Sequence, residues 1–251
     1  KHIFSRFRLY PELNGTKYLH PLKTPARPYI LPEVWAVVDK PHKPLWITEG
    51  EKKALKLMKD ERLAVALSGV WNFKSGKNSE DSASKEIWEE LLEFNMKGRT
   101  VFMAFDIDLW TNPQVRKALY ELALKLYKRG AIVKFVQWNI KEGKGIDEFL
   151  NKTVNPSEAL RKLEDIAKSL EDFVDKEHYE DIVRAIKYAR LPLDKKEMIA
   201  KPLAKIFDLR LKTFEDTIKE EKVPEPEPEK YTEDEIKQAE ALLENPDFWE
   251  E

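Results

Sequence analysis

The chain has 251 residues and no cysteine, which excludes disulfides, thiolate metal sites and a cysteine nucleophile. Its four histidines are scattered, and no two of them have the spacing of metal ligands, so histidine alone does not supply a zinc site. No apolar run reaches the ~20 residues that a membrane span requires, and no segment resembles a secretory leader. These absences predict a soluble protein of a reducing compartment, the cytoplasm.

Neither sign of charge is in excess over the whole chain. The 44 Lys and Arg and 46 Asp and Glu give a formal net charge of −2, which excludes a uniformly basic coat for nucleic acid. Residues 1–43 differ, because eight basic side chains there face only three acidic ones. We expect this basic, partly β N-terminal segment either to contact phosphates or to be an ordinary solvated loop. Its short apolar runs at 29–31 and 34–38 are candidate edge strands.

Two further features concern the origin of the chain. Charged residues make up 36% of it, whereas glutamine occurs only at 114, 137 and 238, a balance typical of thermophile proteins. The first residue is Lys1 rather than methionine, which predicts a fragment of a longer protein.

Residues 44–152 alternate between short apolar runs and helical stretches. The predicted buried strands are 44–48, 63–67, 100–105 and 131–138, and the clearest helices are 51–59 and the stretch from Pro113 to Gly130. Strands that alternate with helices predict βαβ crossovers and a parallel sheet. The fold class is therefore predicted to be α/β, with a four-stranded parallel sheet flanked by helices.

The rest of the chain is predicted to lack strands. Residues 153–221 have amphipathic helical spacing and are expected to form a helical domain. Repeated Pro-Glu pairs at 224–229 predict a stiff linker, and a capping box at Thr232 and Glu235 predicts a last short helix. The expected organisation is thus a basic segment, an α/β domain, a helical domain and a linker with a terminal helix (1–43, 44–152, 153–221 and 222–251).

Acidic residues follow three of the predicted strands. Glu49 follows the first, Asp106 and Asp108 the third, and Asp147 the fourth. The carboxyl ends of parallel strands meet at one edge of the sheet, so these side chains are expected to converge. Each pair of carboxylates at ~4 Å repels by about 4 kcal/mol at an effective dielectric of about 20, and a hard divalent cation removes that repulsion. The pattern predicts a Mg²⁺ or Mn²⁺ site for phosphoryl transfer or phosphodiester hydrolysis.

Each of these acids also has a purely structural interpretation. An acid that follows a strand often caps the next helix, and Asp147 is equally placed to be an N-cap or first-turn acid. The joint placement at three strand ends, in order along the chain, is what favours the metal site. Glu49 could act there as a general base or as a metal ligand, and Gly50 allows a tight turn after it.

The motifs that carry these acids resemble the TOPRIM domain shared by bacterial-type primases, topoisomerases and some nucleases. The resemblance covers about residues 44–152 and rests on LWITEGEKKAL (45–55), LSGVWNF (67–73), the Asp106-x-Asp108 pair and KGIDE (144–148). The first two runs are especially similar to TOPRIM-like domains of phage and plasmid primase-helicase proteins.

The resemblance implies roles for single residues. Glu49 takes the place of the family's acid/base, and Asp106 and Asp108 take the place of its Mg²⁺-binding pair. Asp147 matches the second acid of the primase Asp-Pro-Asp motif, whereas Gly145 replaces the first acid, which puts occupancy by two metal ions in doubt. The chain has no Cys/His zinc finger, so a template-reading module would lie outside it.

Basic and aromatic side chains near these motifs are candidates for contact with single-stranded DNA and phosphate. The alternatives are a solvated helix face for Lys52 and Lys53 and a core position for Trp71 and Phe73, and for Phe73 the core is favoured. Glycines at 69 and 76 lack P-loop spacing, which excludes ATP hydrolysis by that motif. The candidate nucleic-acid or phosphate contacts are Arg6, Arg8, Lys17, Lys52, Lys53, Trp71, Lys74, Lys77 and Lys144.

Taken with these features, the resemblance implies a Mg²⁺- or Mn²⁺-dependent primase-type nucleotidyltransferase. Its expected partners are single-stranded DNA, nucleoside triphosphates and a helicase module in the same full-length chain. Two alternatives stay open: a TOPRIM nuclease that uses the same acids, and a non-catalytic single-strand-binding scaffold attached to a helicase.

Overall fold

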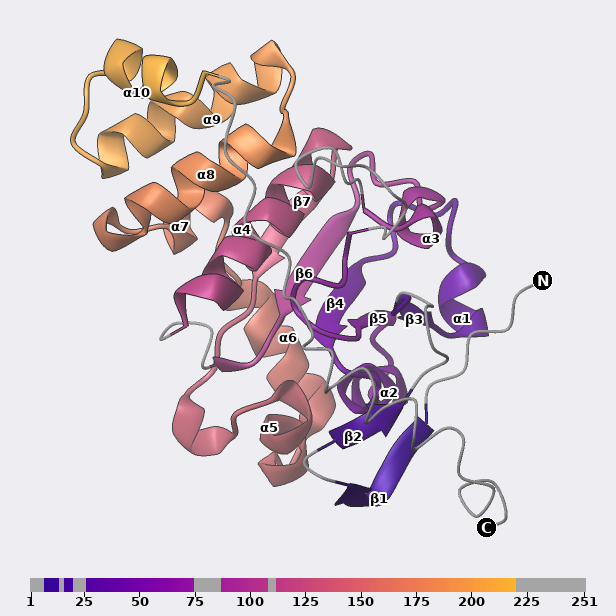
Figure 1. Cartoon of the computed structure of the whole chain (residues 1–251). Helices are drawn as coiled ribbons and strands as arrows, with labels where there is room; N and C mark the ends of the chain where they lie inside the picture. The colour runs from indigo at the N-terminus through magenta and orange to yellow at the C-terminus, as the bar shows by residue number, and fades with distance from the viewer. Residues whose placement is uncertain (1–6, 14–15, 20–25, 75–86, 108–111, 220–251) are drawn as a thin grey trace. The chain divides into compact units, whose positions relative to one another are not determined.

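A computed structural model describes residues 7–13, 16–19, 26–74, 87–107 and 112–219. Its main sheet has five strands in the order β3-β5-β4-β6-β7 (Figure 1). The pairs β4–β5, β4–β6 and β6–β7 are parallel, and β3 joins the edge antiparallel to β5. The α/β prediction is confirmed, and the four predicted parallel strands are all present; the fifth strand, β3, falls at the candidate edge strand 29–31, which had not been assigned to this sheet. These strands are β3 (Tyr29–Ile30), β4 (Leu45–Glu49), β5 (Ala64–Leu67), β6 (Thr100–Ala104) and β7 (Ile132–Phe135).

Helices connect and follow these strands. Asn112 caps the long helix α4 by accepting from the Gln114 N–H, and Pro113 occupies its first turn as predicted. The α-helices are α1 (Pro32–Trp35), α2 (Glu51–Lys59), α3 (Glu89–Leu92), α4 (Pro113–Lys128), α5 (Ile146–Lys152), α6 (Pro156–Ile166), α7 (Leu170–Phe173), α8 (Tyr179–Ala189), α9 (Leu193–Ile206) and α10 (Leu211–Thr217). Two 3₁₀ helices complete the set, η3 (Ile140–Glu142) and η4 (Lys176–His178). Within the described ranges, none of the helices combines the length and the apolar character needed to cross a bilayer.

The main sheet is covered on both faces, which explains why its central strands are mainly apolar and buried. Leu45 and Ile47 of β4 pack into one cluster with α4, α8 and α9. Trp46 of the same strand packs into a second cluster with α2, α5 and α6. Successive residues of a strand point to opposite faces, so one apolar run supplies both cores.

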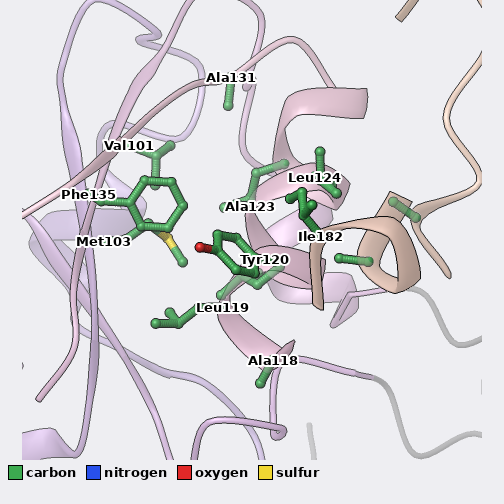
Figure 2. Close-up of a cluster of buried hydrophobic side chains, with 14 of the residues drawn as sticks. Val101, Met103, Ala118, Leu119, Tyr120, Ala123, Leu124, Ala131, Phe135 and Ile182 are labelled. Atoms are coloured by element: carbon green, nitrogen blue, oxygen red, sulfur yellow. The ribbon is translucent and has the colours of Figure 1, made fainter. Parts of the chain in front are cut away.

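Tyr120 of α4 lies at the centre of the first cluster, between the sheet and α8 (Figure 2). Its ring meets Phe135 at 6.3 Å and Phe173 at 5.9 Å between centroids, both edge-on, and it is fully buried. Edge-to-face pairs of this kind add to the burial of apolar area. Helix α8 is therefore packed over the sheet through α4, whereas α6 packs on the opposite face with α2 and α5.

The N-terminal part of the chain is partly β, as predicted. Strands β1 (Phe7–Leu13) and β2 (Thr16–Leu19) form a separate antiparallel pair, and β3 confirms the candidate edge strand at 29–31. The second candidate strand, 34–38, is wrong. Pro32 begins α1 there and Glu33 lies in its first turn, a combination that favours a helix start over an extended edge.

Arg99 holds the turn after α1 against the start of β6. Its guanidinium is fully buried and donates to the carbonyls of Asn95 (2.9 Å), Lys43 (3.0 Å), Val37 (2.9 Å) and Val38 (2.9 Å). Burial lowers the pKa of Arg99. One planar group thus satisfies carbonyls from separate segments of the chain.

We expect Arg99→Lys to lower the free energy of unfolding by about 2–4 kcal/mol, because a single ammonium cannot reach all four carbonyls. Urea unfolding of both proteins measures the change. Arg210→Lys, at an exposed position, is the matched control and should unfold with the wild type. Equal midpoints for Arg99→Lys and the control would contradict the role given to Arg99.

A second prediction concerns pH. The Tyr120 hydroxyl lies 2.7 Å from His178 Nδ1, and burial lowers the pKa of His178 and raises that of Tyr120, so the hydrogen bond joins a hydroxyl to a neutral ring. At a pH above about 6.5, the pKa of histidine in the unfolded chain, the neutral His178 contributes fully to the free energy of unfolding. As the pH falls below about 6.5, the unfolded state binds a proton before the folded state does, and the free energy of unfolding declines. Urea midpoints from pH 7.5 to 5 should fall less steeply in His178→Gln, which keeps an acceptor but does not titrate. Equal pH dependence of the urea midpoints in the wild type and His178→Gln would argue against His178 as the group whose protonation destabilises the fold.

Candidate active site at the carboxyl edge of the sheet

The candidate site lies where the connections of two adjacent parallel strands diverge. From β4 the chain leaves through α2 toward β5, and from β6 it leaves through α4 toward β7, on the opposite side of β4. Helices α2 and α4 pack on opposite faces of the sheet. This is a topological switch point, at which open α/β sheets bind ligands beyond the carboxyl ends of their strands.

The register of β4 and β6 places Glu49 and Asp106 at this edge. Thr48 is the partner of Ala104 in the ladder, and its buried hydroxyl donates to the Ala104 carbonyl at 2.8 Å. Glu49 therefore follows the last pairing by one residue and Asp106 by two. Gly50 then turns the chain into α2 with a φ of +88°, a conformation that favours glycine.

Asp106 forms an ion pair with Lys53 of α2. The distance from Lys53 Nζ to Asp106 Oδ1 is 2.6 Å, and both side chains are more than four-fifths buried. Although the two atoms are close, Oδ1 has no partner with hydrogen-bond geometry, so the contact is mainly one of charge. The pair neutralises a carboxylate that would otherwise be costly to bury.

Gly145 brings Asp147 to the same place. The Ile107 N–H donates to the Lys144 carbonyl at 3.0 Å, which ties the segment after β6 to the start of α5. A Cβ added to Gly145 would lie 2.6 Å from Asp147 Oδ1, 3.4 Å from Asp106 Oδ1 and 2.5 Å from Lys53 Cε. Two carboxylate oxygens and the lysine stem therefore surround one point that has no side chain of its own.

The predicted carboxylates are thus brought together in part. Asp106 and Asp147 lie around Gly145, and Glu49 ends the adjacent strand. Asp108 lies outside the described residues, and among those that are described no group of three or more His, Asp or Glu side chains could hold a metal ion. Mg²⁺ in proteins is often held by only one or two carboxylates with water and substrate phosphate, so Asp106 and Asp147 fit such an ion.

The basic candidates fall into three groups. Lys52 and Lys144 are exposed, Lys52 in the first turn of α2 and Lys144 two residues before α5. Lys53 is paired with Asp106, and Lys74 is paired with the buried Glu121 at 2.8 Å, so both already have acidic partners. Arg6 and Lys77 lie outside the described residues, and Arg8 and Lys17 lie on β1 and β2 with side chains that are not described.

The aromatic candidate Trp71 is half-buried and stacks on Phe73, with 6.3 Å between the ring centroids. Phe73 is fully buried, as expected of a core residue. Lys74 Nζ lies 4.8 Å from the centre of the Trp71 ring, a cation–π distance. Trp71 therefore keeps an exposed part while its other contacts are internal.

Sequence reasoning missed two features of this edge. The role of Lys53 as the partner of Asp106 was not foreseen, although its position on the helix that follows Glu49 was a usable signal. Arg27 was also missed: it is paired with Glu90, lies over Trp88 at 5.3 Å, and accepts at its carbonyl from the Ser68 hydroxyl at 3.5 Å. No local pattern could reveal Arg27, because its partners are more than 40 residues away in the chain.

Gly145→Ala tests the crowding at this point. The added methyl group must displace Lys53 and Asp147, so we expect a loss of about 1–2 kcal/mol in the free energy of unfolding. Lys53→Ala removes one of the two obstacles, so in a double-mutant cycle the two changes should be coupled by about 1 kcal/mol. Denaturant unfolding of the four proteins gives this coupling. Strict additivity would show that Lys53 does not lie against Gly145.

Comparisons with known proteins show what the chain is similar to in sequence and in fold. Residues 34–156, which include every predicted acid, match the profile of a family described as "Domain of unknown function (DUF3854)". An uncharacterized protein of Picosynechococcus sp. is 28% identical over 120 residues, which are 45% of this chain and 12% of that protein, so this chain spans only a small part of its relative. The structure of the DnaG primase catalytic domain bound to ssDNA is similar over 84% of this chain and 67% of that chain, with a TM-score of 0.54 and 18% identity. The chain therefore has a primase-like fold.

Proposed function

We propose that this chain carries the active site of a metal-dependent, primase-type nucleotidyltransferase that makes primers on single-stranded DNA. The observation that carries the proposal is the meeting of Asp106 and Asp147 around Gly145, at the switch point of the sheet. The fold adds support, because a similar solved structure is a primase catalytic domain bound to ssDNA.

The residues that would hold a divalent cation are Asp106, Asp108 and Asp147, with Glu49 either completing that set or acting as the base. A Mg²⁺ or Mn²⁺ ion bound there would stabilise the negative charge that develops on the transferring phosphoryl group. The chain's own contribution is to hold these oxygens at the ends of rigid strands, so that little reorganisation is needed at the moment of reaction.

The reaction joins a nucleoside triphosphate to the 3′ end of a growing primer. The 3′ oxygen forms a bond to the α-phosphorus, the bond from that phosphorus to the bridging oxygen breaks, and pyrophosphate leaves with the electron pair. The hydroxyl proton passes to the Glu49 carboxylate, which ends β4 beside Asp106. The exposed Lys52, which lies on α2 after Glu49, and Lys144, which precedes Asp147, are candidates for contact with the phosphates of template or triphosphate.

The partners follow from the same assignment. Single-stranded DNA would contact the exposed part of Trp71 and the basic N-terminal segment, in which Arg8 and Lys17 belong to β1 and β2. A helicase module in the full-length protein would supply that strand. A nuclease with the same acids is a related possibility, which differs only in using water in place of the 3′ hydroxyl.

One observation favours a second candidate function. Lys53 already neutralises Asp106, and a site whose acids are balanced internally suits a non-catalytic single-strand-binding scaffold. Such a scaffold would bind DNA with the same affinity after changes to Glu49, Asp106 or Asp108.

We expect Asp106→Asn, and separately Asp108→Asn, to reduce primer synthesis at least a hundredfold without unfolding the protein, because both remove a charge that the metal requires. The assay follows a labelled single strand with Mg²⁺ or Mn²⁺, with and without nucleoside triphosphates. Asp165→Asn, an exposed change on α6, is the matched control and should keep full activity.

The products separate the candidate functions. Lengthening that depends on triphosphates supports the primase, shortening supports the nuclease, and tight binding without turnover supports the scaffold. Full primer synthesis by Asp106→Asn or Asp108→Asn would remove the metal site from the mechanism.

A further inference from the structure

Lys53 occupies a position that a metal ion would need. Its Nζ lies 2.6 Å from Asp106 Oδ1, and its Cε passes the open face of Gly145, 2.5 Å from where a Cβ would be. We propose that Lys53 is a resident cation of this site: it holds Asp106 when no metal is bound, and it leaves Asp106 when a divalent cation takes its place. This inference rests on the proposed metal-dependent function and adds a displaceable lysine to it.

The exclusion follows from geometry. An oxygen with an ammonium at 2.6 Å has no room for a metal ion on the same side, since Mg²⁺–oxygen distances are about 2.0–2.1 Å. Asp106 Oδ1 is buried, so it cannot turn toward solvent to hold both cations without moving. Asp106 Oδ1 is also the oxygen that lies with Asp147 Oδ1 around Gly145, so a metal ion held by both of these oxygens would take the place of the Lys53 contact.

The contacts and the flexibility of Lys53 allow its ammonium to move away from Asp106. The ion pair lacks hydrogen-bond geometry, so the ammonium is held mainly by charge, and a doubly charged ion competes well for such a contact. Four flexible methylene groups join Nζ to α2, and the side chain keeps 17% of its surface exposed, which gives it a path outward.

Gly145 makes this arrangement possible. A side chain at this position would collide with the Lys53 stem and with the Asp147 carboxylate. The glycine at 145 therefore leaves the space that the Lys53 side chain fills, and the Lys53 ammonium supplies positive charge at the point where the family motif has an acid. Once displaced, the ammonium lies at the same edge of the sheet as the exposed Lys52 and Lys144 and becomes available to the polyphosphate of a nucleoside triphosphate.

Mn²⁺ titration of the full chain by calorimetry, without nucleotide, tests the competition. Lys53→Met removes the resident cation and should tighten Mn²⁺ binding at least tenfold relative to the wild type. Lys59→Met is the matched control, because it removes the same charge from an exposed position at the far end of α2, and its affinity should stay within threefold of the wild type. Equal effects of the two changes, or weaker binding by Lys53→Met, would overturn the proposal.

A second measurement uses the wild-type side chain and so does not depend on the stability of a variant. In protein with ¹³C at lysine Cε, the Lys53 signal, assigned by its loss in Lys53→Arg, should shift with Mg²⁺ and saturate with metal binding. A signal that does not move while Mg²⁺ binds would overturn the displacement.

These readouts separate this inference from the proposed function. Metal-linked movement of Lys53 in a protein that makes no primers would support the inference and defeat the primase. Primer synthesis by a protein in which Lys53 does not move would support the primase and defeat the inference. Absence of metal binding in every variant would defeat both.

Discussion

The parallel pairing of β4 with β6 is the constraint on which the site depends. Because Thr48 is the partner of Ala104, Glu49 and Asp106 must follow the sheet at the same edge, and their connections must leave on opposite sides of β4. A shift of one residue would turn Leu45 and Ile47 away from the cluster formed with α4, so the apolar core itself specifies the register. The acids are positioned by the same packing that stabilises the fold.

The main parts of the fold could be predicted from the sequence for a related reason. A parallel strand that is covered on both faces is a short run that is mainly apolar; β5 is apolar throughout, and β4 begins with three apolar residues. The segment at 34–38 is also apolar but is not a strand, because Pro32 and the carbonyl contacts of Arg99 hold it in a compact turn. A fully buried arginine that donates to distant backbone cannot be recognised from local pattern.

The candidate site could likewise be predicted from the sequence only in part. Glu49, Asp106 and Asp147 could be placed because the ends of parallel strands share an edge whatever the details of the chain between them. The position of Lys53 on the helix after Glu49 placed it near the site, but its choice of Asp106 as partner depends on how α2 lies against the end of β6, more than 50 residues later. Gly145 was noticed only as a missing acid, and its meaning as space for Lys53 emerges from the contacts around it.

The Lys53–Asp106 pair also explains how a site with partly buried carboxylates can be stable when no metal ion is bound. Buried carboxylates repel each other and are poorly solvated, and in some small domains only a metal ion removes that penalty, so the protein folds when the ion binds. Here an ammonium 2.6 Å from Asp106 supplies the opposing charge from within the chain. Folding is then independent of the metal, and the penalty returns only when the lysine leaves. Any ligand that displaces Lys53 must therefore bring positive charge of its own, which favours a divalent cation over a neutral or anionic molecule arriving alone.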